Sequence, residues 1–96
     1  MLRVPSGILC RLSTPRLLLT GTLEDMSFTG VSVLFPSAPK GSLAGSFLEL
    51  PQITLKVAPV SIVRRWRHIC IRFRVESIEQ GEQRWRDLHH ARWRRL

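Results

Sequence analysis

Apolar and polar residues alternate along most of the first 75 positions, which is the period of a β-strand with one buried face. The clearest run spans residues 69–75, where isoleucine, phenylalanine and valine occupy the odd positions. Cys70, Arg72 and Arg74 occupy the even positions. This pattern predicts a strand with an apolar face against a core and a basic face turned away from it.

Similar patterns predict five further strands before this one. They lie at about residues 7–13, 16–24, 30–35, 47–50 and 53–64, separated by turns and loops rich in proline, glycine and serine. Pro59 interrupts the last of them, and because proline cannot donate to a β-ladder, we expect a bulge or an edge there. Residues 65–68 are expected to form the hairpin connection to the final strand. Six short antiparallel strands favour a closed or half-closed barrel, which removes exposed edges.

The periodicity changes after residue 76. Ser77 lies three positions before Gln80, an arrangement that is typical of a capping box at the start of a helix. The sequence therefore predicts a single, mainly β domain with an N-terminal arm at 1–6, a barrel at 7–76 and a C-terminal α-helix at 77–96. On that helix, five residues can share one face: Trp85, Leu88, His89, Trp93 and Leu96.

Charge points to anionic partners. Fifteen basic residues, thirteen of them arginine, stand against seven acidic ones in a chain of 96 residues, for a net charge of +8. No apolar run approaches the roughly 18 residues of a membrane span, so no transmembrane segment is expected. Cys10 and Cys70 stand alone within apolar strand patterns, which predicts buried, reduced thiols and a cytoplasmic location.

Three residues at fixed offsets lie between two predicted strands. Asp25, Ser27 and Gly30 form the pattern D-x-S-x-x-G. The carboxylate can accept from N–H groups of the backbone or of a ligand, and the serine hydroxyl can both donate and accept. The glycine allows a flat ligand to approach the backbone. A Ser/Thr or Asx turn closed by a glycine would use the same residues without any ligand.

This pattern resembles the signature of the PilZ domain, a bacterial module that binds cyclic di-GMP. In PilZ domains joined to cellulose synthases, an R-x-x-x-R element precedes the first strand and commonly runs into Val-Pro. Arg3, followed by Val4 and Pro5, is similar to the second arginine of that element, and the first would fall before Met1. The resemblance implies a six-stranded antiparallel β-barrel followed by a helix.

The resemblance also implies a function. Arg3 would close over cyclic di-GMP from the arm, and Asp25, Ser27 and Gly30 would form the barrel side of the site, with no metal ion. Ligand binding would order the arm and move a partner, either a glycosyltransferase domain of the cellulose-synthase type or another protein effector. Such a module would act in the cytoplasm or, through its partner, at the cytoplasmic face of the bacterial inner membrane.

Two alternatives stay open. The first is a degenerate PilZ adaptor that binds a protein partner without nucleotide, which the missing first arginine favours. The second is a small nucleic-acid or membrane-surface binder that uses the basic C-terminal helix.

Catalysis is not expected. Glu24 and Asp25 would point to opposite faces of a strand, and Ser27 has no evident histidine base. His68, His89 and His90 lack the spacing of metal ligands. We therefore expect a binding module that is not an enzyme.

Overall fold

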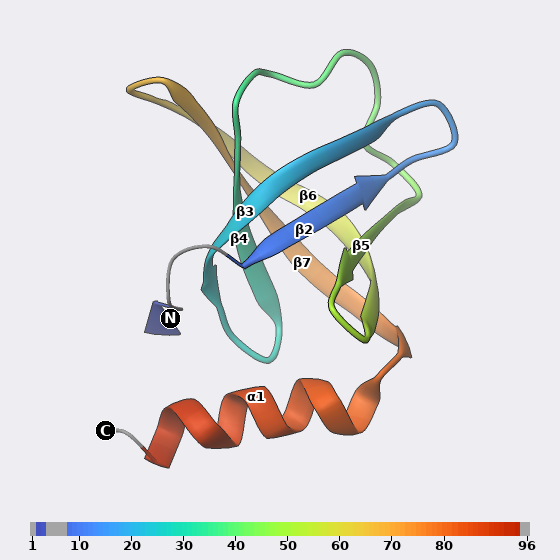
Figure 1. Cartoon of the computed structure of the whole chain (residues 1–96). Helices are drawn as coiled ribbons and strands as arrows, with labels where there is room; N and C mark the ends of the chain where they lie inside the picture. The colour runs from blue at the N-terminus through green and yellow to red at the C-terminus, as the bar shows by residue number, and fades with distance from the viewer. Residues whose placement is uncertain (1, 4–7, 95–96) are drawn as a thin grey trace.

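The computed structural model describes residues 2–3 and 8–94, and the side chains of residues 8–89. Within this part of the chain, the elements follow one another as β1 (Leu2–Arg3), β2 (Leu9–Ser13), β3 (Leu18–Met26), β4 (Gly30–Phe35), β5 (Ser46–Leu50), β6 (Ile53–Arg65), β7 (His68–Gln80) and α1 (Glu82–Arg94). The protein is mainly β, with a single C-terminal helix, as the sequence predicted (Figure 1).

Strands β2 to β7 form a closed, six-stranded antiparallel barrel. Neighbouring strands follow the order β3, β2, β5, β6, β7, β4, and pairing between β3 and β4 closes the ring. The predicted barrel is confirmed. The short strand β1 pairs with Asp25 and Met26 at the end of β3, beyond the point where the pairing of β2 with Thr22 ends.

The core fills the barrel because most inward positions of strands β2 to β7 are apolar, with Ser46 of β5 as a buried polar exception. Val31 and Val33 on β4 are fully buried, and they lie opposite Phe73 and Ile71 on β7. Helix α1 lies across one end of the barrel (Figure 1), and its Trp85 is only 1% exposed and belongs to the same apolar cluster. The helix therefore covers the core at that end.

Several predicted boundaries are confirmed. Strand β4 spans the predicted residues 30–35, and the pairing of β6 with β7 shifts register between Pro59 and Ser61. The connection between β6 and β7 is shorter than the predicted residues 65–68, because Arg65 and His68 pair in the ladder. It has two residues, Trp66 and Arg67, and Arg67 adopts a positive φ of 65°.

The predicted start of the helix is wrong. Residues 77–80 continue β7, where Ile78 lies opposite Leu55 and Gln80 lies opposite Thr54. The cross-strand ladder satisfies the backbone groups that a capping box would have satisfied locally. The chain leaves the strand at Gly81, whose φ is +81°, and the helix begins at Glu82.

Other predicted boundaries also move. The first two barrel strands begin two residues later than expected, at Leu9 and Leu18. The second begins later because Thr14 organises the turn that precedes it. Its Oγ1 accepts hydrogen bonds from the backbone N–H groups of Arg16 and Leu17. Of the predicted apolar helix face, Trp85 and His89 are buried and Leu88 is half-buried. Leu96 and the side chain of Trp93 lie outside the described part of the chain.

Candidate functional site

The predicted site residues gather where β1, β3 and β4 meet. Arg3 of β1 lies directly opposite Asp25 of β3 in the backbone ladder, and Asp25 lies opposite Ser32 of β4. The row continues across β7, where Arg72 lies opposite Ser32. The sheet therefore places two predicted site residues, Arg3 and Asp25, on adjacent strands, although only the backbone of Arg3 is described.

Ser27 and Gly30 close the tight turn between β3 and β4. The Ser27 N–H donates to the Gly30 carbonyl over 2.8 Å, and the Gly30 N–H donates to Ser27 Oγ over 3.1 Å. The Ser27 hydroxyl also donates to the Gly30 carbonyl over 3.3 Å. A hydroxyl oxygen has two acceptor positions, so one remains for a further N–H donor. These residues thus shape the turn in the way a Ser/Thr turn does.

A bulge at Glu24 corrects one expectation. The pairing of β3 with β4 shifts register between Leu23 and Asp25, and Leu23 and Met26 are both buried in the core. The two acidic residues between them therefore both lie on the outer side of the barrel, rather than on opposite faces. The Glu24 carboxylate accepts two hydrogen bonds from Arg65 Nη1, at 2.8 and 2.6 Å. This pairing raises the pKa of the Arg65 guanidinium.

Arg72 and Arg74 of β7 are basic residues that the sequence did not assign to the site. Arg72 lies opposite Ser32, and Arg74 lies opposite Gly30. Both are exposed, and Arg74 contacts Glu76 at 3.5 Å. Alternation along residues 69–75 already predicted their outward direction. Their neighbours could not be predicted, because the pairing of β4 with β7 joins residues about 40 positions apart.

Phe28, at the tip of the turn, connects the site to helix α1. Its ring stacks on the ring of His89, with centroids 4.1 Å apart and an interplanar angle of 29°. His89 in turn contacts Trp85 edge to face at 4.5 Å. The turn that holds Ser27 and Gly30 is therefore packed against the helix that covers the end of the barrel.

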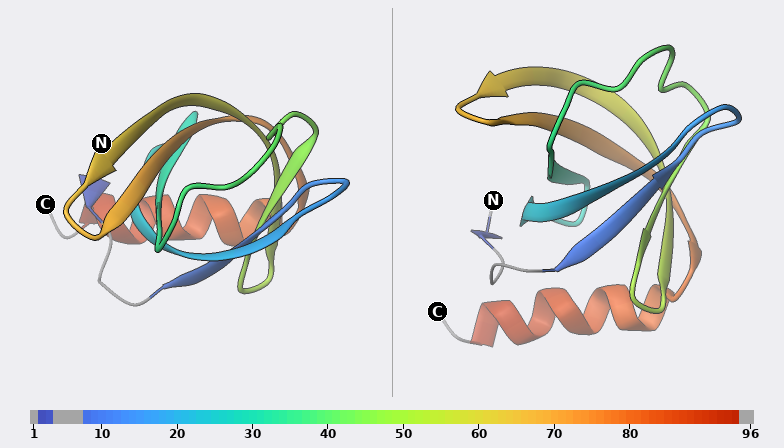
Figure 2. Two further views of the ribbon diagram at one scale, coloured as in Figure 1. Left: turned by 90° about the horizontal axis from the view of Figure 1, so that it is seen from above. Right: turned by 45° about the horizontal axis from the view of Figure 1, so that its top comes forward.

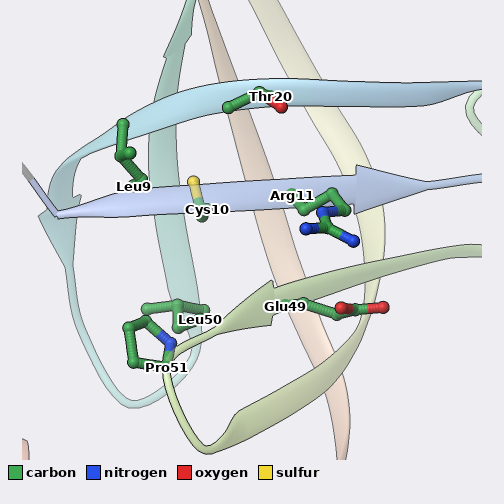
Figure 3. Close-up of a pocket in the computed structure, with 7 residues that line it drawn as sticks. All are labelled: Leu9, Cys10, Arg11, Thr20, Glu49, Leu50 and Pro51. Atoms are coloured by element: carbon green, nitrogen blue, oxygen red, sulfur yellow. The ribbon is translucent and has the colours of Figure 1, made fainter.

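A separate cleft of about 290 Å³ lies on another wall of the barrel, between β2, β3 and β5 (Figure 3). Leu9, Arg11, Thr20 and Glu49 help to line it. None of the predicted site residues does so. Cys10 also borders this cleft but is 3% exposed, and burial raises the pKa of its thiol to about 12. The cleft therefore offers no reactive thiolate at neutral pH.

Among the described residues, no group of three or more histidine, cysteine, aspartate or glutamate side chains is placed to hold a metal ion. No helix in the described part of the chain is long and apolar enough to cross a membrane. No family model, curated protein or solved structure matches this chain.

Proposed function

We propose that this protein is a regulatory module of the PilZ kind that binds cyclic di-GMP at the junction of β1, β3 and β4. Three features support the proposal: the closed barrel, the D-x-S-x-x-G pattern at the turn between β3 and β4, and the pairing of β1 with β3. The third carries most weight, because it sets Arg3 opposite Asp25, two residues far apart in sequence that the ligand needs together.

The chemistry of the residues suits the ligand. Cyclic di-GMP has two guanines and two phosphates, and arginine can bind guanine O6 and N7 together or stack on the ring. In the proposed complex Arg3 takes this role, and the Asp25 carboxylate accepts from the guanine N–H edge. Ser27 Oγ accepts one further N–H through its remaining lone pair. Gly30 has no side chain, so the ligand can approach its backbone. The guanidinium groups of Arg72 and Arg74 contact the phosphates.

In this proposal the ligand binds across the paired strands β1 and β3, holds them together and thereby changes the surface offered to a partner. The partner is a glycosyltransferase of the cellulose-synthase type or another protein effector, in the cytoplasm or at the cytoplasmic face of the inner membrane. The protein itself performs no catalysis. The stacking of Phe28 on His89 offers a second path, because a shift of the turn would be transmitted to α1.

Calorimetric titration of cyclic di-GMP tests the proposal. The chain is compared with a version extended at its N-terminus so that an arginine lies four positions before Arg3. We expect both to bind, the extended form roughly ten- to a hundredfold more tightly, because it regains one charge-assisted contact. GMP at equal concentration is the control ligand and should not bind comparably.

One observation favours a second candidate, an adaptor that binds a protein partner without nucleotide. The Ser27 hydroxyl already makes two hydrogen bonds inside its turn, so the pattern can persist for structural reasons alone. Absence of heat from both forms of the chain would overturn the receptor proposal and leave the adaptor.

A further inference from the structure

The hairpin of β6 and β7 extends beyond the barrel and ends in exposed apolar residues. Figure 2 shows the two strands running together past the rest of the barrel to their connecting turn. Trp66, at that turn, is 84% exposed. Every residue from Val60 to His68 is exposed, and three of these are aliphatic: Val60, Ile62 and Val63.

The apolar residues lie on both faces of this hairpin. Ile62 lies opposite Ile71, which points into the core, whereas Val63 lies opposite Cys70 on the other face. Ile62 and Val63 are 58% and 51% exposed. A protein partner that docked on one face would leave the other apolar face in water. An apolar phase that surrounds the tip on all sides would cover both apolar faces.

The same tip is strongly basic. A cleft of about 270 Å³ between the hairpin and the loop after β4 is lined by Arg64, Arg65, Arg67 and His68, together with Pro36, Ser37, Ala38 and Ile69. Arg65 is held by Glu24. Among the described side chains, neither Arg64 nor Arg67 forms an ion pair, and the Arg67 guanidinium lies 5.7 Å from the centre of the Trp66 ring.

We propose that the tip of the β6–β7 hairpin binds the surface of an anionic phospholipid bilayer. Trp66 enters the interface between headgroups and acyl chains, where its amphipathic ring is stable. Arg64 and Arg67 contact lipid phosphates, with the basic cleft as the place for a headgroup. Ile62 and Val63 are covered by lipid on both faces of the hairpin.

Single-stranded nucleic acid also binds through arginine and aromatic stacking. The aliphatic residues on both faces favour lipid, because base stacking makes no use of them. The proposal does not depend on cyclic di-GMP, since the hairpin tip shares no residue with the site at Arg3 and Asp25.

Co-sedimentation of the full chain with vesicles tests this inference. We expect binding to vesicles that contain phosphatidylglycerol and little binding to vesicles of phosphatidylcholine alone. Trp66→Ala should weaken binding by about tenfold or more, and Arg64→Gln with Arg67→Gln should weaken it about thirtyfold. A matched control, Arg84→Gln with Arg86→Gln on α1, removes the same charge and should change binding by less than about threefold.

Fluorescence locates the contact. Trp66 emission should shift to the blue on adding the anionic vesicles, and this shift should be absent from Trp66→Phe, which retains Trp85 and Trp93. Equal losses from the hairpin and helix variants would overturn the proposal in favour of general charge attraction. Binding to a single-stranded oligonucleotide that is stronger than vesicle binding and equally dependent on Trp66 would overturn it in favour of nucleic acid.

Discussion

The ring of Phe28 stacks on the ring of His89 at 4.1 Å, which joins the turn between β3 and β4 to helix α1. The two residues are 61 positions apart in the sequence. Phe28 also lies inside the D-x-S-x-x-G pattern, one position after Ser27. The contact therefore links the proposed ligand site to the element that covers the end of the barrel.

Replacing Phe28→Ala should loosen the helix. Loss of the stacked pair should lower the free energy of unfolding by about 1 kcal/mol and the melting temperature by roughly 4–8 °C. Amide hydrogen exchange should show faster exchange in α1 than in β4. Phe47→Ala on β5 is the control, because its ring stacks on no other aromatic ring among the described side chains. Equal acceleration of exchange in α1 by both variants would refute this role.

Gly81→Ala should destabilise the connection between β7 and α1. The residue has a φ of +81°, and a Cβ there would overlap the carbonyl oxygen of Gln52. We expect the free energy of unfolding, measured with urea, to fall by more than about 3 kcal/mol. Gly41→Ala is the matched control: its φ is +95°, but no atom lies within 4 Å of the added Cβ. That variant should be destabilised only by the backbone strain of an alanine at positive φ, by about 1–2 kcal/mol. Comparable losses would argue against the overlap.

Asp25→Ala should weaken binding of cyclic di-GMP by roughly ten- to a hundredfold, because a charged acceptor for the guanine edge is removed. Calorimetry on the extended chain measures the effect. Asp87→Ala, an exposed carboxylate on α1, is the control and should leave affinity unchanged. Unaltered affinity in Asp25→Ala would exclude this residue from the site.

The thiol of Cys10 should make stability depend on pH in alkaline solution. Burial raises its pKa from 9.0 to about 12, so between these values the folded state keeps a proton that the unfolded chain has released. Stability is therefore unaffected by this thiol below about pH 9 and falls by about 1.4 kcal/mol per pH unit above it.

Urea unfolding of the reduced protein from about pH 8 to about pH 10.5 checks this dependence. The Cys10→Ala variant should lack the pH-dependent loss of stability that Cys10 causes. The free energies of unfolding of the unsubstituted protein and of the variant should therefore converge as pH rises. Burial also raises the pKa of Cys70, and that contribution is common to both proteins. Parallel curves would contradict the prediction.

Local patterns predicted most of the fold. Alternation of apolar and polar residues placed the strands, and Pro59 marked a real bulge, because side-chain period and proline chemistry act over a few residues. The turn from Ser27 to Gly30 was predictable for the same reason. The start of the helix was not predictable in this way. The capping pattern at Ser77 competes with a β-ladder to residues of β6 that lie more than 20 positions earlier in the chain.

Local patterns of neighbouring residues predict most of each strand, the tight turn at Ser27 and the basic face of β7. Which strands pair depends on contacts between residues far apart in the chain. Cross-strand register set Arg3 opposite Asp25 and Arg72 opposite Ser32, and the bulge at Glu24 turned both acids outwards. The same pairing carried the β6–β7 hairpin beyond the barrel and left Trp66 exposed. A one-residue slip would exchange the two faces of a strand, so register is a property of the packed core as a whole.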